Sequence, residues 1–229
     1  MHKNTVIFDL DGTLADTAPD LIGTLNRIIA PYEVPQVDLK QVGQIVGHGA
    51  KAMIRKAFEI GGKDLQPELQ EALFADFLED YSANIANETR LFDGLLDAMG
   101  ILKEDGFTFC VCTNKMESLA RILVSELGVS DHFSALTGGD TFAFKKPDPR
   151  HLEETVRLMG REIGSAIMVG DSSTDINAAI NAGIPSIAVT FGYSDQPPNS
   201  LGATRIISHY SELHQTIMDI SKKDQAAAT

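Results

Sequence analysis

Paired aspartates stand directly after an apolar run near the start of this 229-residue chain, at Asp9 and Asp11. A third aspartate, Asp171, follows another apolar run far along the sequence. Side chains two positions apart at the end of a strand can face the same side. Two carboxylates that close repel each other, and both stay ionised when a cation lies between them. We therefore predict an all-oxygen Mg²⁺ site that includes these three aspartates, although a lone Asp-x-Asp pair is also typical of an ordinary strand-end turn.

Two further polar segments carry groups that could hold a phosphoryl group. Thr113 opens a Thr-Asn-Lys segment, and Lys146 stands directly before a proline. A hydroxyl and an ammonium beside a nucleophilic carboxylate suit phosphoryl transfer through an aspartyl-phosphate, because that reaction depends mainly on charge neutralisation and positioning. Of the neighbours Lys145 and Lys146 only one needs to face inward, and we favour the one that Pro147 follows. Thr113 could instead, or in addition, cap the helix that comes after it.

The apolar runs that precede these segments predict the elements that position them. They are continuous rather than alternating, which is typical of parallel strands buried on both faces. The runs lie at residues 5–8, 108–112, 166–169 and 186–189, with weaker ones at 134–137 and 205–207. Helical patterns alternate with the runs, at 117–127, 150–159 and 175–182. This alternation predicts an α/β fold with a doubly wound parallel sheet, in which the polar segments meet at the carboxyl ends of the strands.

The segment from residue 17 to residue 88 differs, with apolar side chains at helical spacing and no strand pattern. Its three stripes are Leu21, Leu25, Ile28 and Ile29; Ala50, Met53, Ile54, Ala57 and Phe58; and Leu69, Leu73, Phe77, Tyr81 and Ile85. We interpret them as the core-facing sides of an inserted helical domain, with hinges near 15–16 and 89–92. The expected division is a catalytic core of residues 1–16 and 89–221, a helical domain of residues 17–88, and a flexible tail of residues 222–229.

The composition limits the partners and the surroundings of the chain. Asp and Glu number 32 against 19 Lys and Arg, a formal net charge of −13, and no basic run provides a local exception. Such a surface repels phosphate backbones, so we expect neither nucleic acid nor an anionic membrane as a partner. No apolar stretch suits a spanning helix or a signal peptide, and Cys110 and Cys112 are expected to be reduced core residues. These features predict a cytoplasmic protein.

The four polar segments together resemble the phosphatases of the haloacid dehalogenase superfamily. The matching segments, in the order and spacing of that family, are Asp9-Leu10-Asp11-Gly12-Thr13, Thr113-Asn114-Lys115, Lys146-Pro147-Asp148-Pro149 and Gly170-Asp171-Ser172-Ser173-Thr174-Asp175. The resemblance implies a Rossmann-like core, with Asp9 as the nucleophile and Asp11 as the general acid and base. Dehalogenases of the superfamily lack the second carboxylate because a halide leaving group needs no proton. The presence of Asp11 therefore favours a phosphatase.

The resemblance also implies the ligands of the metal and of the phosphoryl group. Mg²⁺ would be held by Asp9, the backbone carbonyl of Asp11, and Asp171. Asp175 would support either the water shell of the metal or Lys146. The residues that would bind the phosphoryl group are Thr113, Asn114 and Lys146.

The inserted helical domain resembles the four-helix cap of one branch of the superfamily, which closes over the site, excludes water and contributes substrate contacts. Within it, Val46-Gly47-His48-Gly49-Ala50 resembles a stretch of the phosphoglycolate phosphatases in which a Gly-x-Gly-Ala run opens a cap helix. Those enzymes often have asparagine where this chain has His48. Backbone N–H groups at such a helix start can receive an anion, so the candidate substrate contacts are His48, Gly49 and Arg55. Turn glycines and a solvated arginine are the alternative interpretation.

The expected partner is a small phosphorylated metabolite, and hydrolysis of 2-phosphoglycolate to glycolate is the leading hypothesis. A sugar phosphate or pyrophosphate is the nearest alternative substrate. A mutase similar to β-phosphoglucomutase shares the core and the cap but would return the phosphoryl group to a sugar. A phospho-accepting signalling module also uses aspartate and Mg²⁺, but it lacks an inserted cap and an acid two residues after the nucleophile. We expect the chain to be a monomer or a homodimer.

Overall fold

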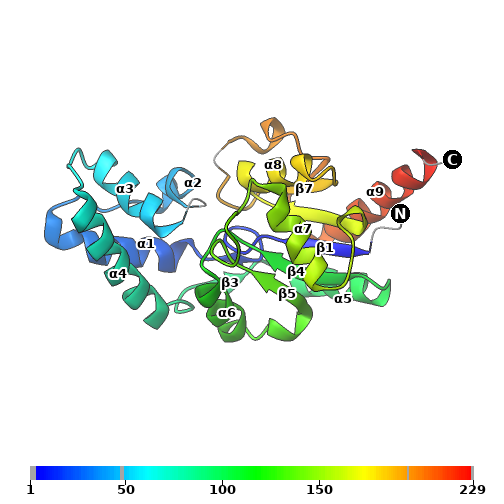
Figure 1. The fold of residues 1–229 in the computed structure, drawn as a ribbon, viewed down its shortest axis with the longest axis horizontal. Helices are drawn as coiled ribbons and strands as arrows, with labels where there is room; N and C mark the ends of the chain where they lie inside the picture. Colours follow the sequence, from blue (N-terminus) through cyan, green and yellow to red (C-terminus); the bar gives the residue numbers. More distant parts are fainter. Residues whose placement is uncertain (1–3, 47–48, 195, 228–229) are drawn as a thin grey trace.

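A six-stranded parallel sheet forms the centre of the computed structural model, which describes residues 4–46, 49–194 and 196–227 (Figure 1). The strands are β1 (Thr5–Phe8), β4 (Thr108–Cys112), β5 (Phe133–Thr137), β6 (Ala166–Gly170), β7 (Ser186–Val189) and β8 (Arg205–Ile207). Their order is β5-β4-β1-β6-β7-β8, and each neighbouring pair is parallel. The predicted doubly wound parallel sheet is therefore confirmed. β1 lies at its centre, where the direction of winding reverses and such folds bind ligands.

Helices cover both faces of the sheet because each strand alternates its side chains between the two faces. α7 (Pro149–Leu158) and α8 (Ser173–Asn181) pack on one face, against a buried cluster that includes Ile7, Met168 and the two free cysteines, Cys110 and Cys112. A second buried cluster, which includes Phe8, lies on the other face. The helices that pack there are α5 (Leu95–Glu104), α6 (Glu117–Glu126) and α9 (Leu213–Ala227). Short 3-10 turns lie at Ala30–Tyr32, Leu39–Gln41, Ser130–His132, Ile163–Ser165, Pro198–Ser200 and Tyr210–Glu212.

A second group of helices projects from one end of the sheet (Figure 1). These helices are α1 (Ala18–Ile29), α2 (Val42–Ile45), α3 (Ala50–Ile60) and α4 (Pro67–Ala83). α4 packs against both α1 and α3, and the three predicted stripes lie largely in this contact, with Leu25, Ile54 and Leu73 fully buried. Hydrophobic burial of these stripes therefore holds the group together, and the buried cluster they form continues to Phe8 in the sheet.

Two linkers join this helical group to the sheet, and they run side by side. β2 (Ala15–Asp16) pairs antiparallel with β3 (Arg90–Leu91). The buried carboxylate of Asp20, in the first turn of α1, accepts hydrogen bonds from the backbone N–H groups of Glu88 and Thr89 and from the Thr89 hydroxyl, at 2.7–3.1 Å. Both segments expected to act as hinges thus lie in or beside one small two-stranded ribbon. The sequence did not indicate this ribbon, because strands of two residues are too short to show a periodic pattern.

The C-terminal segment is helical as far as Ala227, and the flexibility expected of residues 222–229 stays a prediction. α9 continues to Ala227, because its last described residues are mostly good helix formers and the buried Ile217 and Ile220 hold its earlier turns in the core. Residues 228–229 lie outside the described residues. Among the described ranges, no helix combines the length and the apolar character that crossing a membrane requires.

Candidate active site

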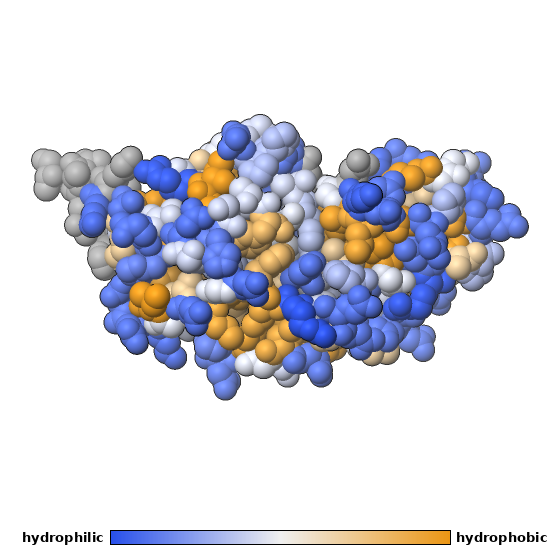
Figure 2. All heavy atoms as spheres, turned by 180° about the vertical axis from the view of Figure 1, so that it is seen from behind, coloured by the Kyte–Doolittle hydropathy of each residue, from blue (hydrophilic) through white to orange (hydrophobic). Residues whose placement is uncertain are grey.

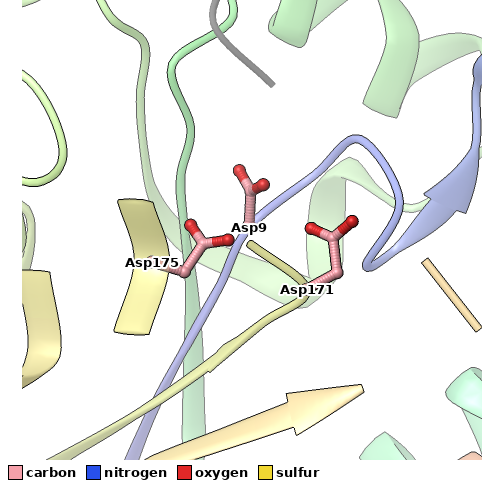
Figure 3. A group of neighbouring side chains, drawn as sticks. All are labelled: Asp9, Asp171 and Asp175. Atoms are coloured by element: carbon pink, nitrogen blue, oxygen red, sulfur yellow. The ribbon is translucent and has the colours of Figure 1, made fainter. Parts of the chain in front are cut away.

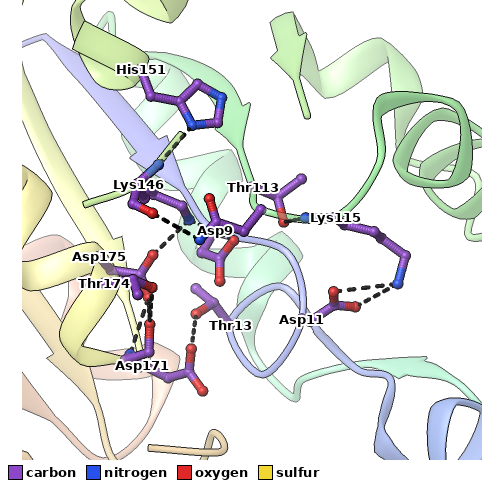
Figure 4. Close-up of polar contacts among 12 residues, drawn as sticks. Asp9, Asp11, Thr13, Thr113, Lys115, Lys146, His151, Asp171, Thr174 and Asp175 are labelled. Atoms are coloured by element: carbon purple, nitrogen blue, oxygen red, sulfur yellow. Dashed lines mark hydrogen bonds and ion pairs between the residues drawn. The ribbon is translucent and has the colours of Figure 1, made fainter. Parts of the chain in front are cut away.

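The loop after β1 brings Asp9 and Asp11 to the carboxyl edge of the sheet in different orientations. Asp9 continues the strand, and its backbone N–H donates to the Val169 carbonyl of β6 at 3.0 Å. The chain then turns at Gly12, whose φ is 77°. A Cβ there would lie 2.4 Å from a carboxylate oxygen of Asp171, so the turn requires glycine. Asp11 consequently points away from Asp9 and Asp171, toward Lys115 (Figure 4).

Three buried carboxylates gather at this edge, those of Asp9, Asp171 and Asp175, with oxygens within 4.8 Å of one another (Figure 3). Lys146 reaches among them, with Nζ 2.8 Å from Asp9 Oδ1 and 2.6 Å from Asp175 Oδ1. The backbone N–H and the hydroxyl of Ser172 donate to Asp175 Oδ2 at 3.1 and 2.6 Å, in the capping box that begins α8. Both oxygens of Asp175 are therefore engaged, and its direct role here is to hold Lys146.

Burial and mutual repulsion set the electrostatics of this cluster. Burial, reinforced by the charge of Asp175, raises the pKa of Asp9 to about 6 against the opposing pull of Lys146. Burial and the charges of Asp175 and Asp9 also raise the pKa of Asp171 well above its usual value. Burial alone would lower the pKa of Lys146, but its two carboxylate partners raise it, so Lys146 stays a cation.

The donor set of this cluster fits a hard divalent cation. All the ligand atoms are oxygens, and among the described residues the Lys146 ammonium pairs with only two of the three carboxylates, those of Asp9 and Asp175. The raised pKa values of Asp9 and Asp171 reflect burial and the repulsion among these carboxylates. A bound cation would offset this repulsion. Asp11 could add a backbone carbonyl, because its side chain points elsewhere.

Asp171 is held by groups that the sequence analysis did not single out. The Tyr193 backbone N–H donates to Asp171 Oδ2 at 2.6 Å, and the Thr13 hydroxyl donates to Oδ1 at 3.3 Å. The Tyr193 hydroxyl accepts a hydrogen bond from the Ala18 N–H at 2.8 Å and donates one to Asp16. The loop after β7 therefore connects Asp171 to the linker that leads into α1. No sequence pattern marks Tyr193, because only the path of this loop brings it to the site.

Lys146 is oriented by neighbours on both sides of its loop. Its side chain is 1% exposed, whereas the adjacent Lys145 is exposed, so the lysine directly before Pro147 is the one that points inward. The Lys146 N–H donates to His151 Nδ1 at 3.2 Å, and Asn114 Nδ2 donates to the Lys146 carbonyl at 3.0 Å. Burial lowers the pKa of His151 to about 4, which keeps the ring neutral and able to accept. Sequence reasoning assigned no role to His151.

Thr113 and Asn114 line the cavity from the loop after β4. Thr113 Oγ1 accepts from the Lys115 N–H at 3.2 Å, and α6 begins after Met116, so Thr113 does not cap that helix. Among the described residues nothing accepts the Thr113 hydroxyl proton, so this hydroxyl can donate to a ligand in the cavity. The Asn114 amide nitrogen is instead used on the Lys146 carbonyl. One N–H of this amide thus helps to position Lys146, and because the amide nitrogen carries a second N–H and Asn114 lines the cavity, the expected phosphoryl contact stays a prediction.

A cavity lies between the helical cap and the carboxyl edge of the sheet. Its core-side lining includes Asp9, Asp11, Thr113, Lys146 and Thr174. The cap contributes mainly apolar side chains, which are Leu21, Val46, Met53, Phe74, Phe77 and Leu78. Figure 2 shows apolar surface on the cap beside the hollow that separates the two parts of the molecule. A ligand bound here would meet charged groups on one side and hydrophobic groups on the other.

The three cap residues named as substrate contacts have different positions. Gly49, at the start of α3 with φ 92°, lines the cavity together with Ala50. Arg55 is exposed further along α3 and is not among the lining residues, so the expected contact from Arg55 is not found in this arrangement. His48 lies outside the described residues.

Lys115 is a further buried cation at the cavity to which sequence reasoning gave no role. Its Nζ lies 3.0 and 3.3 Å from the two carboxylate oxygens of Asp11 and donates to the Tyr81 hydroxyl of α4 at 2.8 Å (Figure 4). The ammonium also lies over the Tyr81 ring, 4.5 Å from its centroid. Burial alone would lower the pKa of Lys115, but Asp11 and Tyr81 raise it. The lysine of the Thr-Asn-Lys segment was the signal that could have identified it.

Comparisons with known proteins agree with this arrangement. The family model for haloacid dehalogenase-like hydrolases matches residues 6–189. A phosphoglycolate phosphatase of Mesorhizobium japonicum is 43% identical over 213 residues, which cover 93% of this chain and 94% of the relative. One of Agrobacterium fabrum is 42% identical over 223 residues, covering 97% and 96%. The crystal structure of a predicted phosphoglycolate phosphatase from Haemophilus somnus superposes with a TM-score of 0.88 at 26% identity, covering 94% of this chain and 98% of the other.

Proposed function

The chain belongs to the haloacid dehalogenase-like hydrolase family, and on that basis we propose that it is a Mg²⁺-dependent phosphatase. The proposed reaction is the hydrolysis of 2-phosphoglycolate to glycolate and phosphate through an aspartyl-phosphate at Asp9. The relatives named phosphoglycolate phosphatase, which match nearly the whole chain, support this substrate. The observation that carries the reaction class is the buried Asp9 carboxylate, which lines a cavity together with Lys146 and Thr113.

Asp9 supplies the attacking oxygen in the first step. The bond from Asp9 to phosphorus forms while the bond from phosphorus to the ester oxygen breaks. Lys146 and the free hydroxyl donor of Thr113 stabilise the charge on the transferring phosphoryl oxygens. Mg²⁺, held by Asp9, the Asp11 carbonyl and Asp171, would add further charge neutralisation when bound.

Asp11 is the proposed acid and base. Its carboxylate lines the cavity but stands apart from the cluster of Asp9, Asp171 and Asp175, so it can exchange protons with a ligand while the cluster holds the cation. Protonated Asp11 gives its proton to the leaving ester oxygen. The resulting carboxylate then takes a proton from the water that attacks the phosphorus of the acyl-phosphate, which regenerates Asp9 and releases phosphate.

The helical group of residues 17–88 is proposed to act as a cap over a core of residues 1–16 and 89–221. Its residues line the same cavity as Asp9, and the paired linkers β2 and β3 join it to the core at one place. Closure of such a cap excludes water from the reacting groups. The start of α3 at Gly49 is proposed as an anion contact because Gly49 and Ala50 line the cavity and the first N–H groups of a helix can receive an anion.

Phosphate release from a panel of phosphorylated metabolites tests this proposal. We expect 2-phosphoglycolate to have the highest kcat/KM, and excess chelator to abolish turnover of every substrate. Formation of an isomeric sugar phosphate without free phosphate would identify a mutase instead.

The covalent step has its own test at Asp9. Asp9→Asn should abolish turnover, and borohydride reduction of acid-quenched wild-type protein should convert the acyl-phosphate at residue 9 to homoserine, which mass spectrometry detects. An Asp9 that stays unmodified during steady turnover would contradict the aspartyl-phosphate. The sugar phosphates and pyrophosphate of the panel serve as the comparison substrates.

A further inference from the structure

We propose that Lys115 and Tyr81 form a subsite for a carboxylate on the leaving group of the substrate. This inference rests on the proposed phosphatase function and extends it, because it names the groups that distinguish an acidic leaving group from a neutral one. Lys115 belongs to the core loop after β4, and Tyr81 belongs to α4 of the cap. A carboxylate bound between them would contact both parts of the molecule.

The distribution of positive charge in the cavity carries the first step of the argument. Lys115 and Lys146 are the cationic side chains among the described residues that line it. Lys146 is engaged with Asp9 and Asp175 beside the nucleophile, which places it at the phosphoryl group. Lys115, whose side chain is 5% exposed, lies at Asp11 instead. A doubly acidic substrate such as 2-phosphoglycolate needs a second cation, and Lys115 is in position to provide it.

The chemistry of the leaving group fixes where this cation must stand. The ester oxygen has to lie beside Asp11, because Asp11 protonates it in the proposed reaction. In 2-phosphoglycolate a single methylene separates that oxygen from the carboxylate carbon. The carboxylate therefore stays close to Asp11, which is where Lys115 Nζ lies, 3.0 Å from Asp11 Oδ1. An ammonium has three N–H donors, so Lys115 can serve Asp11, Tyr81 and a ligand together.

Tyr81 provides a second donor at the same place. The Tyr81 side chain is fully buried, and its hydroxyl oxygen accepts a hydrogen bond from Lys115 Nζ at 2.8 Å. Among the described residues nothing accepts the proton of the Tyr81 hydroxyl, although buried polar groups are normally satisfied. A carboxylate in the cavity would accept that proton with one oxygen and contact the Lys115 ammonium with the other. The pair thus offers both donors that a planar carboxylate requires.

The apolar cap lining disfavours the main competing class of ligand. Met53, Phe77 and Leu78 face the cavity and offer no partner to the hydroxyl groups of a sugar. Burying unpaired hydroxyls against such side chains is unfavourable, whereas the methylene of a small acid is compatible with them. The cavity therefore combines two separated cations with an apolar surface, which suits a short phosphorylated acid.

A matched pair of substrates tests the subsite. 2-Hydroxyethyl phosphate has the same ester as 2-phosphoglycolate but carries CH₂OH in place of the carboxylate. We expect the wild-type protein to prefer the acid, and Lys115→Met to reduce the ratio of the two kcat/KM values by roughly 10- to 100-fold, because a charge-assisted contact is lost. Tyr81→Phe should reduce the same ratio by about 3- to 10-fold. If either substitution also disturbs Asp11, the kcat/KM values of both substrates fall by the same factor, and their ratio does not change.

Binding to an inactive protein separates recognition from turnover. In the Asp9→Asn background with Mg²⁺, calorimetry should show that Lys115→Met weakens 2-phosphoglycolate binding by roughly tenfold or more while leaving 2-hydroxyethyl phosphate binding nearly unchanged. Lys145→Met is the matched control, because it removes an exposed lysine that does not line the cavity and should leave both the binding and the selectivity ratio unaltered.

The outcomes that overturn the inference are distinct from those that overturn the function. Equal losses on both esters in Lys115→Met, with the ratio unchanged, would show that Lys115 only positions Asp11. Wild-type hydrolysis of both esters with equal kcat/KM would overturn the carboxylate subsite and leave the phosphatase intact. Hydrolysis of neither ester would overturn the proposed function together with the subsite.

Discussion

Replacing Asp9 by asparagine should stabilise the metal-free protein at alkaline pH, although it removes the proposed nucleophile. Burial and the charge of Asp175 raise the pKa of Asp9 to about 6 in the folded protein, against a usual value of 3.8. Between these two pH values the folded state binds a proton that the unfolded state has released. The free energy of unfolding therefore falls as the pH rises through this window, and the whole loss is present above pH 6.

The size of the effect follows from the same two values. At about 1.4 kcal/mol per pKa unit, the gap between 3.8 and about 6 corresponds to about 3 kcal/mol. Asparagine is close in shape to a protonated carboxyl and carries no charge, so Asp9→Asn should recover about 3 kcal/mol at pH 8 and almost nothing at pH 4. For a chain of this length the gain corresponds to a rise in Tm of roughly 6–12 °C.

Thermal and urea unfolding in excess chelator, followed by far-ultraviolet circular dichroism because the chain has no tryptophan, measure this gain. Added Mg²⁺ should stabilise the wild-type protein more than the variant, since the carboxylate of Asp9 is a proposed ligand. The difference in free energy of unfolding between the two proteins should therefore become smaller or change sign. Asp11→Asn is the matched control: it leaves the buried Lys115 without its carboxylate partner and should destabilise the protein. An Asp9→Asn protein no more stable than wild type at pH 8 would refute the reasoning.

Three further substitutions test other contacts of the site and the hinge. Lys146→Met removes the ammonium between Asp9 and Asp175, so urea unfolding in chelator at pH 8 should show a loss of about 3–5 kcal/mol; a neutral result would mean that the carboxylates are already protonated. Gly192→Ala would place a Cβ 2.4 Å from Asp171 Cβ and 2.2 Å from a backbone oxygen, and calorimetric titration should show Mg²⁺ affinity reduced by roughly 10- to 100-fold. Unaltered affinity would exclude Asp171 as a ligand. Asp20→Ala leaves the N–H groups of residues 88 and 89 without their acceptor, and thermal unfolding should report a loss of about 3 kcal/mol, with faster amide exchange at these two residues.

Much of the fold could be predicted because local patterns encode it. The apolar run at 108–112 coincides with β4, and the helical pattern at 117–127 ends one residue beyond α6 (Glu117–Glu126). The ribbon of β2 and β3 was not predicted, because two residues per strand carry no periodicity. The extension of α9 to Ala227 was also missed, since polar residues at a chain end resemble a flexible tail even when their helix propensity is high.

The sequence by itself determined which chemical groups meet at the site. Asp9, Thr113 and Asp171 each follow a strand of one parallel sheet, and parallel strands bring their carboxyl ends to the same edge. Only the tertiary structure decided how the charges pair. Lys146 joins Asp9 and Asp175, while Lys115 joins Asp11 and the cap through Tyr81. The physical reason is that these pairs connect elements far apart in the chain, and the contact between Lys115 and Tyr81 also depends on how the cap packs over the core.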